Sequence, residues 1–119
     1  MTYYSGFVLA VPAANKQAYV DMARQTWPMF ERLGAIRMVE NWGEDVPHGK
    51  QTDFYRATNA EDGEVPLFSW IEWPDRATAD KAHAAMGEEM KDKPMPGMPF
   101  DGMRMFWGGF APVFDSRDR

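Results

Sequence analysis

The pattern of apolar and polar positions predicts four β-strands, at residues 3–11, 35–46, 65–73 and 103–114. Side chains along a strand point alternately to its two faces, so residues two apart share a face. In the first, third and fourth of these stretches, both alternating sets carry large apolar residues. This pattern is typical of strands that are buried on both faces.

Two segments between the strands follow a helical period. Apolar residues recur at steps of three or four through residues 14–33, where Asn15 is a candidate N-cap and Gly34 a suitable stop. Pro28 should kink or divide this helix, because proline removes one backbone hydrogen bond and crowds the preceding turn. A second helix is expected to open at Asp75, which is placed to cap its N-terminus.

Three shorter stretches give local expectations. Residues 52–60 fit either a short helix capped by Thr52 or Asp53 or an extra edge strand, and the sequence leaves both open. Residues 91–102 are rich in Pro, Gly and Met and are expected to form a loop. The Gly108–Gly109 pair within the last strand indicates a bulge or a close backbone approach.

The order of elements is therefore β-α-β-β-α-β, which predicts an α+β, ferredoxin-like fold over residues 1–119 as a single domain. Such a fold has an antiparallel sheet with both helices on one face. The apolar residues on the second face then lack a cover within the chain. A second copy of the same sheet would bury them, so the pattern predicts a homodimer with a barrel or sandwich between its subunits.

Composition narrows the function classes. The chain of 119 residues carries a net charge of −5 and has no cysteine. Disulfides, thiolate metal sites and cysteine nucleophiles are thereby excluded, and the acidic balance argues against nucleic-acid binding. We find neither a secretory signal nor an apolar run long enough to cross a membrane. These observations favour a cytoplasmic protein without nucleic-acid or membrane partners.

Two glutamates and an arginine are the candidate catalytic residues. Glu40 and Glu72 lie among aromatic residues near the ends of two strands that this topology makes neighbours. Partial burial would raise the pKa of either carboxyl group and suit it to general acid or base chemistry. Arg104 could steady an oxyanion. The alternative is that both glutamates are solvated or form structural ion pairs with Arg37 or Arg104.

Aromatic side chains are the candidate ligand-binding residues. Ligand pockets commonly combine aromatic walls with a few polar groups. Four aromatic residues of the predicted strands could line a cavity in this way, namely Tyr3, Trp42, Trp70 and Trp107. Ordinary core or interface packing is the alternative for each of them.

We predict neither a metal site nor a cofactor. His48 and His83 lie far apart, without the spacing of a ligand set, and are expected to be surface histidines. The methionines of the C-terminal part could in principle favour Cu(I), but they serve equally as adaptable packing residues.

Several segments resemble the YbaA-like bacterial family, a domain of unknown function. They are SGFVLAVP at 5–12, VENWGEDVPHGKQTDF at 39–54, FSWIEWP at 68–74 and MPFDGMRMFWGGF at 98–110. The resemblance covers nearly the whole chain and implies a ferredoxin-like fold of the dimeric α/β-barrel superfamily. It implies no activity and brings no catalytic residues with it.

More distant members of that superfamily include metal-free monooxygenases, isomerases and haem-degrading enzymes. The haem degraders are expected to use an Asn on the first strand, a Trp on the third and a His on the second helix. Trp70 and His83 match two of these positions, but the first strand has no Asn. Asn41, Trp42 and Arg104 match residue types that the monooxygenases use, although adjacent strand residues should point to opposite faces.

Three functional hypotheses follow. The leading one is binding of a small apolar or aromatic ligand in a cavity at the sheet, with metal-free monooxygenase-like or isomerase-like chemistry. The alternative, from a different class, is a non-catalytic dimeric binding or interaction module. A haem-binding enzyme is the third.

Overall fold

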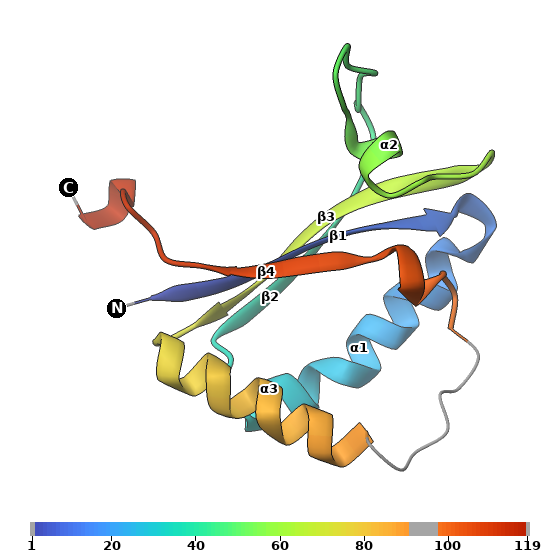
Figure 1. The fold of residues 1–119 in the computed structure, drawn as a ribbon. Helices are drawn as coiled ribbons and strands as arrows, with labels where there is room; N and C mark the ends of the chain where they lie inside the picture. The colour runs from blue at the N-terminus through green and yellow to red at the C-terminus, as the bar shows by residue number, and fades with distance from the viewer. Residues whose placement is uncertain (1, 91–97, 119) are drawn as a thin grey trace.

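The computed structural model describes residues 2–90 and 98–118, and its centre is a four-stranded antiparallel sheet (Figure 1). The strands are β1 (Tyr3–Pro12), β2 (Arg37–Trp42), β3 (Glu64–Trp73) and β4 (Phe106–Phe110). Their order across the sheet is β2-β3-β1-β4, with β2 and β4 at the edges. The predicted ferredoxin-like arrangement is therefore present.

Helices α1 (Lys16–Arg32) and α3 (Arg76–Met90) both lie on one side of the sheet (Figure 1). A short helix, α2 (Phe54–Ala57), rises on the other side with the loop that precedes it. Short 3-10 turns occupy Ala13–Asn15, Gly102–Arg104 and Ser116–Asp118. One face of the sheet is thus covered by helices, and we call the opposite face the helix-free face.

Strands β2 and β4 are shorter than the sequence pattern predicted. The amide of Gly43 donates to the carbonyl of Pro66 at 3.0 Å, and this bond is the last link from the end of β2 to β3. The N–H and C=O of one strand residue point toward the same neighbouring strand. The carbonyl of Pro66 faces β2, so the N–H that proline lacks would also have faced β2, and the ladder stops there. Before β4, Asp101 accepts from the amide of Met103 and turns residues 102–104 into a 3-10 helix.

Pairing of β1 with β4 is regular through Gly108 and Gly109, so the bulge is absent, and the group that approaches Gly109 closely is a side chain and not another backbone. A β-carbon on Gly109 would collide with the ring and hydroxyl of Tyr3. The glycine leaves room for that ring on the helix-covered side of the edge strand.

Most of the predicted helix ends are confirmed. Asp75 caps α3 by accepting from the amide of Thr78 at 2.7 Å, and Gly34 takes a positive φ of 108° after α1. Asn15 occupies the N-cap position of α1, but its side chain donates to the carbonyl of Pro99 instead. The helix continues through Pro28. Proline has no N–H to donate to the carbonyl four residues earlier, but this side of α1 is exposed, so water can bind that carbonyl.

The open question about residues 52–60 is settled in favour of the helix. Asp53, and not Thr52, caps α2 by accepting from the amide of Arg56 at 2.8 Å. A second carboxylate oxygen of Asp53 accepts from the amide of Gly49 at 3.0 Å and ties the preceding loop to the helix. The loop expected at 91–102 lies largely outside the described residues, since the structure describes only its part from residue 98.

The core lies between the sheet and the two long helices. Leu9, Val11 and Leu67 pack with Tyr19 near α1, while Ile71 and Trp73 pack with Ala79 near α3. The small residues of α3 allow close approach of the helix to the large indole of Trp73, which is fully buried. Its Nε1 donates to Ser5 Oγ at 3.0 Å, so the one polar atom of that ring has a partner.

Candidate functional site

Glu40 is the predicted catalytic residue that the structure places in a special environment. It lies on the helix-covered face of β2, opposite Ser69 of β3. Tyr19 of α1 donates a hydrogen bond from its hydroxyl to Glu40 Oε1 at 2.8 Å, and the tyrosine is buried. A carboxyl group and a phenol therefore meet at the inner surface of the sheet.

Burial is the main cause that raises the pKa of Glu40 above its ordinary value of 4.5. The hydrogen bond from Tyr19 acts in the opposite direction and limits the rise. The nearby Ser69 also lowers this pKa, although its buried Oγ makes no well-formed hydrogen bond within the described part of the chain. Burial and the adjacent carboxylate together raise the pKa of Tyr19, so the phenol stays protonated and acts as a donor.

A hollow of about 500 Å³ adjoins this pair, between α1 and the edge strand β2. Its apolar walls include Val20, Ala23, Trp27 and Met38. Four polar side chains also line it, namely Tyr19, Glu40, Arg24 and Arg37. Apolar walls with a few polar groups are typical of small-molecule sites. The arrangement is chemically able to hold an apolar molecule against a carboxyl group that can take up or release a proton.

Glu72 lies elsewhere. It is on the helix-free face of β3, because it pairs in register with Tyr4 and Arg37, whereas Glu40 pairs with Ser69. It lines another hollow, of about 550 Å³, together with Trp70 and Phe114. The two glutamates are on neighbouring strands, as predicted, but the sheet itself separates them.

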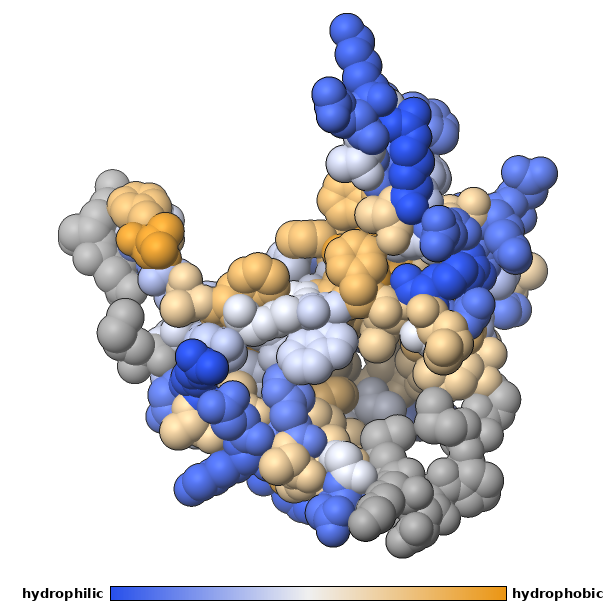
Figure 2. All heavy atoms as spheres, in the orientation of Figure 1, coloured by the Kyte–Doolittle hydropathy of each residue, from blue (hydrophilic) through white to orange (hydrophobic). Residues whose placement is uncertain are grey.

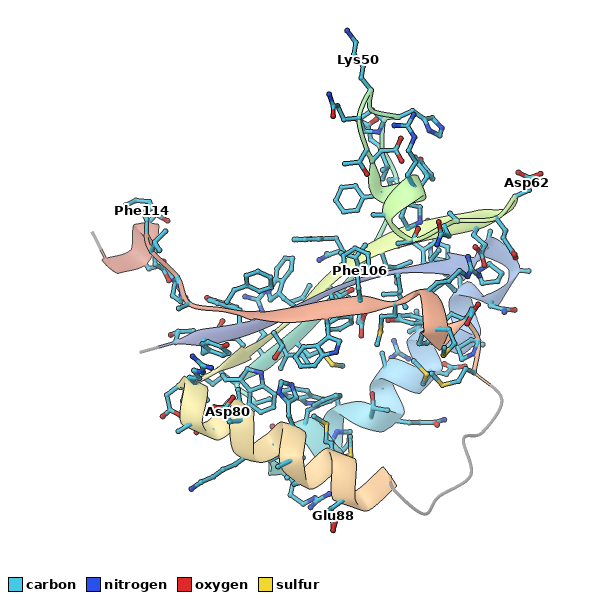
Figure 3. The ribbon with its side chains drawn as sticks, viewed as in Figure 1. Lys50, Asp62, Asp80, Glu88, Phe106 and Phe114 are labelled. Atoms are coloured by element: carbon cyan, nitrogen blue, oxygen red, sulfur yellow. The ribbon has the colours of Figure 1, made fainter. Side chains whose placement is uncertain are left out.

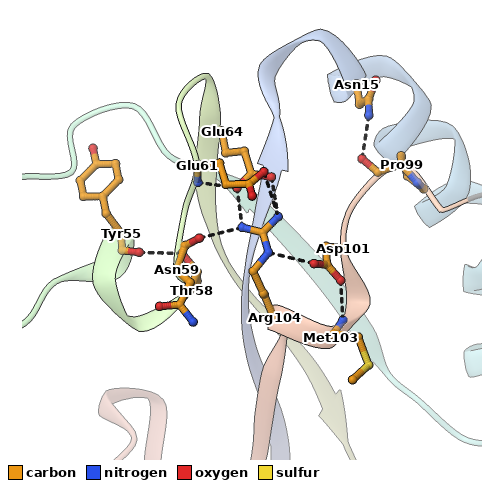
Figure 4. A network of polar contacts seen from close by, with 10 residues as sticks. All are labelled: Asn15, Tyr55, Thr58, Asn59, Glu61, Glu64, Pro99, Asp101, Met103 and Arg104. Carbon is orange, nitrogen blue, oxygen red and sulfur yellow. Dashed lines mark hydrogen bonds and ion pairs between the residues drawn. The ribbon is translucent and has the colours of Figure 1, made fainter.

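Arg104 forms ion pairs with Glu64 and Asp101, and not with Glu40 or Glu72 (Figure 4). Its guanidinium makes two bonds to the carboxylate of Glu64, at 2.6 and 2.7 Å, and one to Asp101 at 3.0 Å. A further bond reaches the carbonyl of Asn59 at 2.8 Å. This bidentate geometry joins the start of β4 to the start of β3, so the guanidinium is occupied with structural contacts.

The predicted ligand-binding aromatics divide between the two faces. Trp42 and Tyr3 contact the core on the helix-covered face, where Lys16 and Arg76 respectively lie over their rings. Trp107 is on the edge strand and contacts His83 of α3, with ring centroids 5.0 Å apart. Trp70 is on the helix-free face, so these four residues do not form one cavity.

The same separation affects the residues compared with haem-degrading enzymes. His83 lies on the helix-covered side, where it also contacts Trp73 at 6.0 Å, and Trp70 lies on the other side of the sheet. Asn41 and Trp42 point to opposite faces, as their adjacency predicts: Trp42 packs on the core, while Asn41 is exposed and donates to the carbonyl of Phe68 at 3.0 Å. Neither set of residues converges on one site.

The helix-free face carries a second hollow, an apolar groove of about 500 Å³ (Figure 2). Three phenylalanines border it, Phe68, Phe106 and Phe110, with exposed fractions of 51%, 45% and 59%. Tyr4, Val8 and Trp70 complete its floor. The sequence predicted apolar residues on this face, and the structure brings them into one continuous patch.

Sequence reasoning missed Tyr19 as a functional residue, because it was placed only in the apolar stripe of the first helix. A signal existed: a tyrosine buried in a helix stripe needs a partner for its hydroxyl. Glu40 is the polar residue that the facing strand offers to that stripe.

Two further properties of the described residues bear on function. None of the helices among them combines the length and apolar character that crossing a membrane requires. Within the same residues, no three or more histidine, aspartate or glutamate side chains gather closely enough to hold a metal ion.

The four-stranded antiparallel sheet with its helices defines an α+β protein of the ferredoxin-like class, and a solved structure supports this. It is described as a dimeric ferredoxin-like protein from an uncultured marine organism, and it matches with a TM-score of 0.61. The match covers 96% of this chain and 97% of that one at 11% identity, so it bears on the fold alone.

Sequence comparison gives the family. The model of the family described as protein of unknown function (DUF1428) matches residues 2–102. The chain is 47% identical over 116 residues to the uncharacterized protein YbaA of Escherichia coli strain K12, covering 97% of this chain and 99% of that protein. YbaA of Shigella flexneri matches to the same extent. The chain belongs to this family, as its sequence motifs predicted.

Proposed function

We propose that this protein is a homodimer whose subunits each bind a small apolar or aromatic molecule beside Glu40. The helix-free face is the dimer interface in this proposal, and the hollow between α1 and β2 is the binding site. A cytoplasmic location, which the cysteine-free composition favours, is part of the same proposal.

The observation that carries the binding site is the contact of Tyr19 with Glu40 at the wall of a hollow lined by both apolar and charged residues. A ligand that donates a hydrogen bond, such as a phenol or an enol, would meet an acceptor there, and apolar walls would hold its ring. Burial raises the pKa of Glu40 above its ordinary value, which suits its carboxyl group to general acid or base chemistry. Metal-free, isomerase-like proton transfer is the chemistry that fits best.

A matched pair of variants tests the binding site. Glu40→Gln keeps the shape of the side chain but removes its charge and its ability to exchange a proton, and Glu72→Gln makes the same change across the sheet. We expect some members of a panel of phenols and cyclic ketones to raise the melting temperature of the native protein and of Glu72→Gln, and to have a smaller effect on Glu40→Gln. Equal shifts in all three proteins would contradict the site at Glu40.

The dimer interface is supported by the exposed phenylalanines of the helix-free face. Aromatic side chains carry about 150–250 Å² each, so three rings at half exposure leave on the order of 300 Å² of apolar surface. A standard interface buries about 800 Å² per partner, and the groove floor and flanking segments supply further surface. The solved relative is described as dimeric, which agrees with this proposal.

Phe110→Asp tests the interface, because Phe110 is exposed on the helix-free face and contributes little to the core. A charge buried between two sheets should raise the dissociation constant of the dimer at least ~100-fold, or about 2.7 kcal/mol. Sedimentation equilibrium measures this, and circular dichroism should show an unchanged fold. Native protein that sediments as a 13.6 kDa monomer at micromolar concentration would contradict the proposal.

A non-catalytic dimeric module remains the second candidate, and the chemistry of the groove favours it. The walls of that groove are almost wholly apolar, as expected of a surface that serves association alone. This candidate predicts a dimer in which no member of the panel binds, so the two experiments above separate it from the first.

A further inference from the structure

Two segments project from the helix-free face, at opposite ends of its apolar groove (Figures 1 and 3). One is the raised loop, residues 43–57, which includes α2 and carries Lys50 at its tip. The other is the C-terminal arm, residues 111–117, which follows β4 and carries Phe114. The register separates them: Phe68, near the raised loop, pairs with Val8, whereas Phe110, where the arm begins, pairs with Tyr4.

Both projections present apolar side chains to solvent. Val113 is fully exposed on the arm, and Phe114 is 75% exposed. At the other end, Phe54 of α2 is 40% exposed and packs edge-to-face on Phe68, with ring centroids 6.1 Å apart. Two adjacent apolar residues at the tip of a surface arm are unusual unless another surface covers them.

The shape of the face limits how a second copy can sit on it. The raised loop stands higher above the sheet than the arm does (Figure 1). If a twofold axis brought like ends together, two raised loops would meet and hold the sheets apart. If the axis exchanges the ends, each raised loop stands beside the lower arm of its partner, and the two grooves can close.

We propose that in the dimer the Val113–Phe114 tip of each C-terminal arm packs against the partner subunit's Phe54 and Phe68. This inference rests on the proposed homodimer and adds its geometry. The dimer would then contain two such contacts. Each subunit would supply the arm of one contact and the Phe54–Phe68 surface of the other. The four exposed apolar side chains would be buried together with the groove.

Single cysteines test the pairing cleanly, because the chain has none of its own. Ser116→Cys marks the arm and Ala57→Cys marks the raised loop, and both leave the proposed contact intact. A mixture of the two variants, re-equilibrated and treated with a short bis-maleimide, should give a covalent dimer, whereas each variant alone should give little. Asp80→Cys lies on α3, on the other side of the sheet (Figure 3), and serves as the control. It is mixed with Ser116→Cys or with Ala57→Cys in place of the other variant.

The outcomes separate the failure of this inference from the failure of the dimer. Covalent dimers from Ser116→Cys alone would mean that the two arms meet each other. The proposed pairing of each arm with the raised loop of the partner subunit would then be wrong. A sample that sediments as a dimer but cross-links no better than the Asp80→Cys control would overturn the pairing and leave the dimer standing. A monomeric sample would overturn both.

A second pair of substitutions measures the contribution of the contact. Val113→Ser with Phe114→Ser should raise the dissociation constant of the dimer about tenfold or more. Both residues are exposed in the single subunit, so circular dichroism and the unfolding of the monomeric Phe110→Asp background should not change. An unchanged dissociation constant would contradict the proposed contact.

Discussion

The two faces of the sheet are built from the same strands and are both apolar, yet only one of them is closed by the chain itself. On the helix-covered face, Leu9, Val11 and Trp73 are fully buried under α1 and α3. On the helix-free face, Phe68, Phe106 and Phe110 remain about half exposed. Strand composition alone therefore indicates how much surface must be buried, and not what buries it.

The faces also differ in polar chemistry. The closed face contains Glu40 and Tyr19, a titratable pair held in partial burial. The groove on the open face is apolar along its length, and Glu72 lies beyond it near the C-terminal arm. We therefore propose association and acid–base chemistry for opposite sides of one sheet.

The largest difference between the two faces is expected when one tryptophan is truncated on each face of β3. Trp73→Ala removes a fully buried indole and should lower the free energy of unfolding by about 3–5 kcal/mol. Trp70→Ala, three residues earlier on the helix-free face, should cost less than half as much in a single subunit. Urea denaturation in the monomeric Phe110→Asp background measures both without a contribution from association, and equal losses would contradict the distinction between the faces.

A smaller effect is expected inside the closed face. Tyr19→Phe removes the hydroxyl that donates to Glu40 and should lower the free energy of unfolding by about 1–2 kcal/mol. It should also raise the pKa of Glu40 further, because the hydrogen bond normally lowers it. Carbon-detected NMR titration of the glutamate carboxyl groups reports this pKa, and a fall in Tyr19→Phe would count against the pair.

The pH dependence of that pair has a definite sign. The folded-state pKa of Glu40 lies above its ordinary value of 4.5, so folding favours its protonated form. Its contribution to stability is greatest below the ordinary pKa and is lost as the pH rises through the folded value. Glu40→Gln should remove this loss and make the variant relatively more stable at neutral pH.

The smallest expected effect concerns the Arg104 contacts at the end of the sheet. The guanidinium lowers the pKa of Glu64 and of Asp101, chiefly through its hydrogen bonds. Their contribution to stability is present above the ordinary pKa values and is lost as the pH falls through the lowered folded values. Arg104→Met should therefore weaken stability at neutral pH but flatten its decline in acid, and thermal melts from pH 6 to 3 would detect the difference.

Much of the fold could be predicted from the sequence, because alternation and helical spacing are local signals. The order of elements along the chain, the Asp75 cap and the Gly34 stop are examples. The C-terminal end of β2 could not be predicted, because it depends on the proline at position 66 of β3, whose missing N–H faces β2. That is a property of pairing and not of either strand alone.

The candidate site was only partly predictable, for a related reason. Glu40 and Glu72 were correctly placed on neighbouring strands, but their register puts them on opposite faces. The role of Arg104 depends on Glu64, forty residues earlier, and no local pattern signals that contact. The catalytic roles first assigned to Glu72 and Arg104 remain predictions without support from their positions, whereas the environment of Glu40 supports the role proposed for it.

Close packing of Gly109 against Tyr3 has a consequence for how sequences of this family can vary. The glycine has an ordinary backbone conformation, so volume and not strain keeps a side chain out. We therefore expect the side-chain volumes at the two positions to be inversely related, so a bulkier residue at 109 is tolerated once the ring at position 3 is lost. Tyr3→Ala combined with Gly109→Val would restore packing that either change alone disrupts, and relatives without the tyrosine should be free to carry a β-carbon there.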